Sequence, residues 1–244
     1  MQHIGPHGEA TPFTPRELAE SVIAGPTYEP PYAGALQDEF AWHLVKYLRE
    51  DLRLQGEAAL EVDGPTGPAV YTVDFLLEVP QPDGTVRRVA VECGGARSLR
   101  DRERQLRRDA NLLASGAVDA LYRLRGSDLL HHMEDCLYLM SMWEGNGPTS
   151  PFSERGRINL QTLASPEAQT LRLRPEQPSV MVTYVLGPES EEDFPERHLW
   201  HAANGLHPFV LLRRFDARFP DVWAPYADVL APAHRQPAPL RKVG

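Results

Sequence analysis

Two residue types are scarce in this chain of 244 residues, and each scarcity excludes a class of site. The two cysteines, Cys93 and Cys136, form no CxxC pair and are too few for a disulfide framework. A reducing cytoplasm is therefore the expected compartment. Lysine occurs only as Lys46 and Lys242, so nearly all positive charge is arginine. Any chemistry that needs an ammonium group has only these two candidates.

Long apolar runs are also absent. No stretch reaches the roughly 18 apolar residues of a membrane-spanning helix, and residues 1–13 lack the basic and then apolar order of a secretion signal. We therefore expect neither secretion nor a membrane span. The formal net charge is −9, from 25 Lys and Arg against 34 Asp and Glu. That balance excludes a globally basic polymer binder, so any contact with nucleic acid must come from a local patch.

Composition and hydrophobic periodicity divide the chain into three parts. Residues 1–34 are an arm with several Gly and Pro residues and one short helical pattern at 15–24. Residues 35–143 are the regular core, and the turn-rich stretch 144–151 is the best boundary. Residues 144–244 are a C-terminal extension of uncertain α+β structure. Its pattern predicts a strand at 179–186, a helix at 194–204, either type at 208–215, and disorder from about residue 232.

The core is predicted to have the element order α-β-β-β-α-β-α. Apolar residues at steps of three and four predict an amphipathic helix from Ala35 to Leu54. Three strands follow, and Pro82-Asp83-Gly84 is a strong hairpin signal between the second and the third. The strands are predicted at 58–62, 69–79, 85–93 and 117–124, and the later helices at 98–115, ending at Gly116, and at 127–142, capped by Ser127 or Asp128.

Two acids interrupt the apolar strands of this hairpin. If the loop has three residues centred on Asp83, residues equally distant from Asp83 are paired, and Asp74 lies opposite Glu92. Such neighbours have Cβ atoms roughly 5 Å apart, so two carboxylates repel unless a cation or a proton lies between them. A two-residue turn would shift the register by one and remove this opposition. Solvent-facing edge positions are the plain alternative, but burying an acid in an apolar run is costly without a partner.

The order of elements and these acids resemble the core of the PD-(D/E)XK, or restriction-endonuclease-like, nuclease superfamily. In that superfamily a helix bearing a glutamate precedes a hairpin with Asp on one strand and Glu-x-Lys on the next, and a helix and a strand follow. The corresponding residues here are Glu39, Asp74 and Glu92. The continuation Asp109-x-x-Leu-Leu-x-x-Gly116 into a strand is similar to the very-short-patch-repair-like branch.

The resemblance implies an α/β fold with a restriction-endonuclease-like αβββαβ core and a mixed central sheet. It also implies a metal-dependent nuclease that hydrolyses DNA phosphodiester bonds. Asp74, Glu92 and the carbonyl of Cys93 would then ligate Mg²⁺ or Mn²⁺, which prefer oxygen ligands. Glu39 would ligate a second ion or orient a water.

One residue departs from the family pattern, because Gly94 replaces the motif lysine that helps to activate the attacking water. Lys46 lies two turns after Glu39 on the predicted helix and is a candidate replacement. Gln105 and Arg104, on the helix after the Glu strand, are the other candidates. The departure puts catalysis in question while leaving the metal ligands in place.

Arginines gather on this same helix. In an acidic protein their spacing covers one broad helix face beside the predicted site, where guanidinium groups can grip backbone phosphates. A solvated face with internal ion pairs is the plain alternative. The residues are Arg97, Arg100, Arg104, Arg107 and Arg108.

Two other functions stay open. A degenerate nuclease-like domain, which binds nucleic acid or a protein partner and cleaves nothing, is favoured by Gly94 and opposed by the retention of both acids. Alternatively, residues 151–244 are a surface for a homodimer or a protein partner. The histidine groups at 131–132 and 198–207 lack a third metal ligand at a defined spacing, so we expect surface or core histidines there.

Overall fold

A computed structural model describes residues 2–4, 10–12, 26, 32–64, 67–94, 99–184 and 209–227. The strands are β1 (Gln2–Ile4), β2 (Ala10–Pro12), β3 (Arg53–Gly64), β4 (Gly67–Pro80), β5 (Val86–Cys93), β6 (Ala120–Leu124), β7 (Ser179–Thr183) and β8 (Phe209–Asp216). The helices are α2 (Ala35–Leu44), α3 (Leu99–Ala114), α4 (Gly126–Glu144), α5 (Glu154–Leu163), α6 (Pro166–Gln169) and α9 (Pro220–Trp223), and the 3-10 turn η1 (Ala224–Tyr226) follows. The helices predicted at 15–24 and 194–204 and the predicted disordered tail lie outside the described residues.

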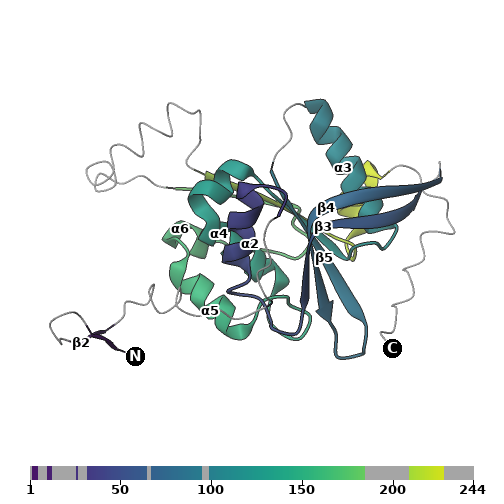
Figure 1. Cartoon of the computed structure of the whole chain (residues 1–244). Coiled ribbons are helices and arrows are strands. Elements are labelled where there is room, and N and C mark those ends of the chain that lie inside the picture. The colour runs from purple at the N-terminus through teal and green to yellow at the C-terminus, as the bar shows by residue number, and fades with distance from the viewer. Residues whose placement is uncertain are drawn as a thin grey trace.

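Six of these strands form one mixed sheet, in the order β3-β4-β5-β6-β8-β7 (Figure 1). Neighbouring strands are antiparallel except for β5 and β6, which are parallel. A helical crossover through α3 makes the parallel connection, as parallel neighbours require. The predicted α/β class with a mixed central sheet is confirmed. β1 and β2 pair only with each other, as a short hairpin that the sequence analysis did not predict.

The sheet separates two hydrophobic cores. Helices α2, α4, α5 and α6 lie on one side of it and α3 lies on the other (Figure 1). Successive side chains of a strand point to opposite faces. On β5, Val91 therefore joins the first core together with Phe40 of α2, whereas Ala90 joins the second together with Ala110 of α3.

The first helix ends at Leu44 and not at Leu54, so its predicted length was wrong. Beyond the helix the chain is held by the distant segment 151–153. Leu48 forms an isolated β-bridge with Phe152, and the Arg49 N–H donates to the Pro151 carbonyl at 2.9 Å. Leu48 and Leu52 are nevertheless buried. Their spacing in the sequence is helix-like because both pack into the core, although neither lies in a helix.

Other boundaries also differ from the prediction, and β3 spans Arg53–Gly64 where a strand was predicted only at 58–62. Gly116, at a φ of +73°, ends α3 as expected, but the N–H groups of Ala117 and Val118 then donate to the Leu112 carbonyl at 3.1 and 3.3 Å. This C-terminal cap uses residues predicted as strand, so β6 begins only at Ala120.

Helix α4 has no side-chain cap, although Ser127 or Asp128 was predicted to provide one. The helix begins earlier, at Gly126, with Arg125 in the N-cap position. The carboxylate of Asp128 instead accepts from the N–H of Leu211 at 2.9 Å and pairs with Arg125. Asp128 thus ties α4 to β8.

Residues beyond the predicted boundary at 144–151 complete the same sheet. β8 pairs with β6 and β7 pairs with β8, both antiparallel. The predicted strand at 179–186 is present at Ser179–Thr183, and the segment 208–215, left open between strand and helix, is a strand. In the part of the chain that the structure describes, no helix is both long and apolar enough to cross a membrane.

Candidate functional site

The hairpin of β4 and β5 has the register predicted from a three-residue loop centred on Asp83. Its three-residue loop is confirmed, because the Gln81 N–H donates to the Thr85 carbonyl at 2.8 Å across Pro82-Asp83-Gly84. The pairs run from Pro80↔Val86 to Phe75↔Val91. Beyond the last of these pairs, Asp74 and Glu92 lie close enough for the charge of Asp74 to raise the pKa of Glu92.

The carboxylate of Asp74 lies against the end of β5. Its Oδ2 accepts from the Cys93 backbone N–H at 2.7 Å, and Asp74 itself is half-buried. The Cys93 side chain points the other way, into the core under α2 and α4. Burial raises the pKa of that thiol well above its ordinary value, so Cys93 packs as an inert apolar group.

Glu92 is a largely buried acid, with 9% of its surface exposed. Burial raises its pKa to about 6, and the negative charge of Asp74 contributes to that rise. The guanidinium of Arg108 opposes the rise, because its Nη2 donates to Glu92 Oε1. The same Nη2 donates to the Thr72 carbonyl at 2.6 Å. Arg108 therefore bridges α3, β4 and β5 at the proposed site.

A second ion pair lies beside this one. Asp109 is fully buried, and both of its carboxylate oxygens accept from Arg123, one of them from Nη2 at 2.7 Å. Arg123 is the register partner of Glu92 on the parallel neighbour β6. The sequence pattern included Asp109 but did not predict this pairing, because only the β5–β6 register brings Arg123 to the site.

A third acid of the sheet, Glu57 on β3, was also missed. The pairs Gly56↔Phe75 and Ala58↔Val73 flank it, which leaves Glu57 across from Asp74. It is exposed and has a φ of +48°, the only positive φ among the described residues other than glycine. Strained backbone of this kind often lies near functional sites.

Glu39 and Lys46 are not brought to Asp74 and Glu92. Helix α2 covers the opposite face of the sheet, where Glu39 is exposed and accepts from His43 at 3.2 Å. Lys46 lies beyond the end of α2, is buried, and places its Nζ 2.9 Å from the ring centroid of Trp42. The expected alignment of Glu39 and Lys46 along one helix face is lost because α2 ends at Leu44.

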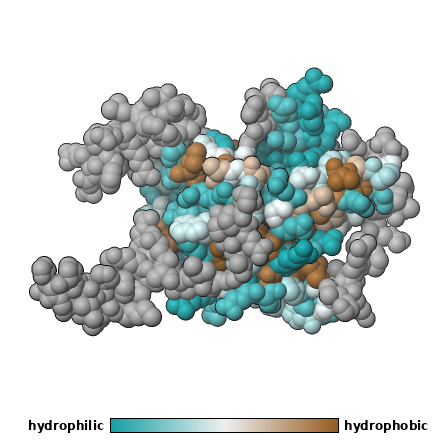
Figure 2. Space-filling model, viewed as in Figure 1, coloured by the Kyte–Doolittle hydropathy of each residue, from teal (hydrophilic) through white to brown (hydrophobic). Residues whose placement is uncertain are grey.

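The predicted arginine face projects from the molecule along the first half of α3. Arg100, Arg104 and Arg107 are exposed, and Figure 2 shows hydrophilic surface over this projecting end. Arg107 donates to Glu103 at 2.9 Å, one turn earlier. Gln105 is half-buried and lies one turn before Arg108 and Asp109, on the same helix face. Arg97 lies outside the described residues.

Gly94 has a backbone that suits glycine alone. Its φ is +138°, and a Cβ added there would meet no atom within 4 Å. The N–H of Gly94 donates to the Leu124 carbonyl at 2.8 Å, which fixes the exit of β5 beside β6. The position where the sequence resemblance predicts a lysine is therefore open in space, but its backbone conformation disfavours any side chain.

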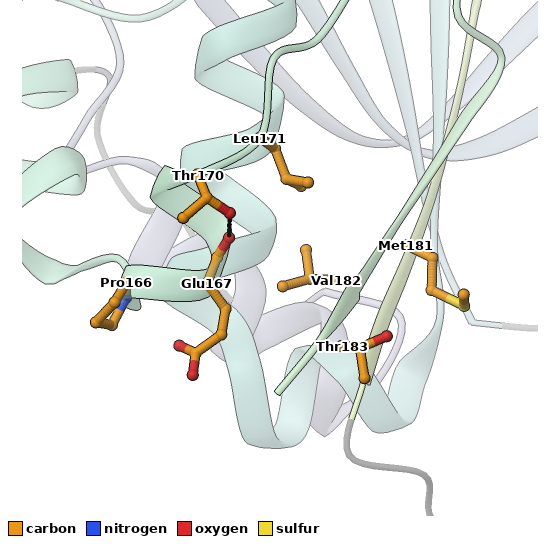
Figure 3. Close-up of a pocket in the computed structure, with 7 residues that line it drawn as sticks. All are labelled: Pro166, Glu167, Thr170, Leu171, Met181, Val182 and Thr183. Atoms are coloured by element: carbon orange, nitrogen blue, oxygen red, sulfur yellow. Dashed lines mark hydrogen bonds between the residues drawn. The ribbon is translucent and has the colours of Figure 1, made fainter. Parts of the chain in front are cut away.

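Other surface features lie apart from these acids. A shallow pocket between α6 and β7 is lined by Pro166, Glu167, Thr170, Leu171, Met181, Val182 and Thr183 (Figure 3). None of these residues belongs to β4, β5 or α3. Within the described ranges, no group of three or more His, Cys, Asp or Glu side chains is arranged to hold a metal ion. A cation at Asp74 and Glu92 would therefore depend on two side chains, with carbonyl and water oxygens as its other ligands.

Comparison with known proteins adds no family to this geometry. No protein-family model, no curated protein and no solved structure matches the chain.

Proposed function

We propose that this chain is a metal-dependent nuclease of the restriction-endonuclease-like type, in which Asp74 and Glu92 hold Mg²⁺ or Mn²⁺ and DNA is the substrate. The observation that carries the proposal is the proximity of two acids at the end of β5, where Asp74 accepts from the Cys93 N–H and its charge acts on the buried Glu92. Mg²⁺ usually binds through one or two carboxylates and keeps several waters. Two carboxylates and the Cys93 carbonyl match that requirement.

A bound divalent cation supplies a coordinated water of lowered pKa and neutralises charge on the scissile phosphate. The protein's part is to hold the ligands. The Cys93 N–H fixes one oxygen of Asp74, and pairing with β6 together with the bond from Arg108 fixes Glu92. Arg108, once released from Glu92, can donate to a phosphate oxygen, since guanidinium groups bind phosphate as readily as carboxylate.

Activation of the attacking water is the weak part of this site, because Gly94 provides no ammonium group. Gln105, on the same face of α3 as Arg108, carries an amide that can orient a water but cannot take its proton. Arg104 stays protonated and cannot act as a base. We therefore expect slower turnover than in a site that keeps the lysine.

A second candidate function is a degenerate nuclease-like domain that binds nucleic acid and cleaves nothing. The ion pair between Glu92 and Arg108 favours it, because a guanidinium already neutralises the buried acid. In that case Arg108 is a permanent partner, and removing it would leave a buried charge uncompensated.

Cleavage of plasmid and single-stranded DNA in Mg²⁺ and Mn²⁺ separates the two candidates. Asp74→Asn keeps the shape of the side chain and an acceptor for the Cys93 N–H but deletes the charge, so a nuclease should lose nearly all turnover while folding normally. The matched control is Asp63→Asn, at an exposed position on β3, which should cleave like wild type. Cleavage that persists in Asp74→Asn would contradict the proposed site.

Thermal melting with and without metal completes the test. Wild type should gain melting temperature in Mn²⁺, because an ion that binds only the folded state stabilises it, and Asp74→Asn should gain none. No cleavage by any form together with no metal-dependent shift would favour the degenerate domain. Lys46→Ala should retain activity, since Lys46 lies against Trp42 on the other face of the sheet.

A further inference from the structure

A row of charged residues crosses the sheet at the level of the two acids. Glu92 of β5 is paired with Arg123 of β6, and Arg123 is paired with Arg213 of β8. Directly paired residues point to the same face of a sheet. Glu92, Arg123 and Arg213 therefore lie side by side on the face under α3, one interstrand spacing of about 4.8 Å apart. From β4 to β8 the row changes from two acids to two arginines.

The two arginines differ in how their charge is balanced. Arg123 is bonded to both carboxylate oxygens of Asp109. Arg213 is half-buried, and among the residues that the structure describes none forms an ion pair with its side chain or accepts a hydrogen bond from it. Asp109 lies within electrostatic reach of Arg213, but its oxygens are already taken by Arg123.

The surroundings of Arg213 disfavour its charge. Burial lowers the pKa of the guanidinium, and the positive charges of Arg102 on α3 and of Arg123 lower it further. Like charges placed directly opposite each other destabilise a sheet. Arginine nevertheless stays protonated in proteins. Within the described part of the chain, this partly buried guanidinium therefore lies near two other guanidinium groups without a carboxylate bonded to it.

We propose that Arg102 and Arg213, beside the ion pair of Arg123 with Asp109, bind a backbone phosphate of a nucleic-acid strand, which flanks the bond cleaved at Asp74 and Glu92. The second half of this statement rests on the proposed function. Two interstrand spacings, roughly 10 Å, separate Glu92 from Arg213, about the rise of three nucleotides along one strand. The strand would cross the sheet under the projecting half of α3.

An aromatic neighbour favours a nucleotide over a free phosphate ion. Tyr226 of η1 lies within electrostatic reach of Arg213 and is 41% exposed. Exposed aromatic rings beside basic groups are the usual stacking surface for the bases of single strands. The cluster thus offers a charge for the backbone and a ring for a base.

The salt dependence of binding tests the site without any cleavage. The affinity of the full chain for a fluorescein-labelled single-stranded oligonucleotide is measured by anisotropy in EDTA over a series of salt concentrations. Arg213→Gln should weaken binding several-fold and flatten the slope of log K against log salt by about 0.7, the value for one lost phosphate contact on a single strand. Arg213→Lys keeps the charge and should restore the slope.

The matched control is Arg155→Gln, an exposed arginine of α5 on the opposite side of the sheet, which should follow wild type. Equal slopes for Arg213→Gln and Arg155→Gln, or no binding by wild type, would overturn the proposal. So would displacement of the oligonucleotide by millimolar inorganic phosphate at constant ionic strength, because the site would then serve the free ion.

Failure of this proposal is distinguishable from failure of the nuclease proposal. Suppose that Arg213→Gln flattens the slope of log K against log salt, but that Asp74→Asn still cleaves DNA or that no form cleaves it. The phosphate site then stands and the nuclease proposal alone fails. If wild type cleaves and the slope is unchanged, the phosphate site alone fails.

Discussion

Gly94 directly follows β5, at the position where the sequence resemblance predicts a lysine. Its φ of +138° is a conformation that residues with a Cβ rarely adopt, whereas the space around it is open. Glycine is therefore required here by the backbone conformation directly after β5 and not by crowding from neighbouring atoms. Restoring the lysine therefore requires a change of backbone as well as of residue.

We predict that Gly94→Ala and Gly94→Lys lower the free energy of unfolding by the same amount, about 1–3 kcal/mol, because both strain the backbone equally. Urea unfolding of the two variants beside wild type measures this. If Gly94→Lys lowered the free energy of unfolding and Gly94→Ala did not, the effect would come from the charge, and the explanation by backbone strain would be wrong.

Asp216 gives the clearest prediction for pH. Burial raises the pKa of its carboxyl, but the bonds from Arg218 and Arg214 outweigh burial and hold the pKa below its ordinary value of 3.8. A carboxyl whose pKa is depressed on folding stabilises the protein above the unfolded pKa and loses this contribution as the pH falls through the folded pKa.

Asp216→Asn should therefore cost about 3–5 kcal/mol at pH 7, since it leaves the buried Arg214 without its partner. The difference from wild type should shrink as the pH falls below 3.8, where the wild-type carboxyl also loses its charge. Urea unfolding at pH 7 and pH 3 measures both values, and a difference that stays constant with pH would refute this reasoning.

At the scale of elements, α3 has two halves with different tasks. Its second half is buried and supplies Asp109 and Leu112 to the interior, whereas its first half is exposed and rich in arginine. In an acidic chain, a helix that projects with unburied arginines offers a local surface for polyanions.

Replacing Arg104 and Arg107 by Ala should weaken duplex DNA binding and flatten its salt slope by about 0.9 for each lost phosphate contact. Arg108 is left in place because it is bound to Glu92. The measurement is anisotropy in EDTA, with Arg155→Ala as control. An affinity and slope equal to those of the control would make the arginine face a solvated surface only.

Short-range sequence signals predicted the hairpin and its register, because the loop at Pro82-Asp83-Gly84 sets the pairing of the two strands that it joins. These local signals failed where contacts with segments distant in the sequence determine the structure. Contacts with the segment 151–153 hold the chain after Leu44 outside a helix. The apolar residues there keep a helical spacing all the same, and this spacing led to the wrong prediction. Arg123 and Arg213 were missed for the same reason, since only the β5–β6 and β6–β8 registers bring them beside Glu92.

At the scale of the whole molecule, the segment after the turn-rich stretch completes the fold. β8 covers the otherwise open edge of β6, whose residues Leu121 and Tyr122 are fully buried. Glu144 at the end of α4 accepts from the Tyr122 hydroxyl at 2.7 Å and pairs with Arg87. The segment 35–143, predicted as an αβββαβ core, therefore depends on strands β7 and β8, which come later in the chain.

A fragment of residues 1–150 should consequently fail to fold cooperatively, because it exposes the β6 edge and the apolar face of α4. Heteronuclear NMR and thermal melting of the fragment, with the full chain as control, measure this. Dispersed amide signals and a sharp melting transition in the fragment would contradict the prediction and make residues 35–143 an independent domain.

Anomalous diffraction from crystals soaked in Mn²⁺ tests the proposal that Asp74 and Glu92 share a divalent cation. We expect one anomalous peak between the two carboxylates, with Arg108 moved away from Glu92, and no peak there in Asp74→Asn crystals. No peak at this position in wild type, with the ion pair between Arg108 and Glu92 intact, would contradict it.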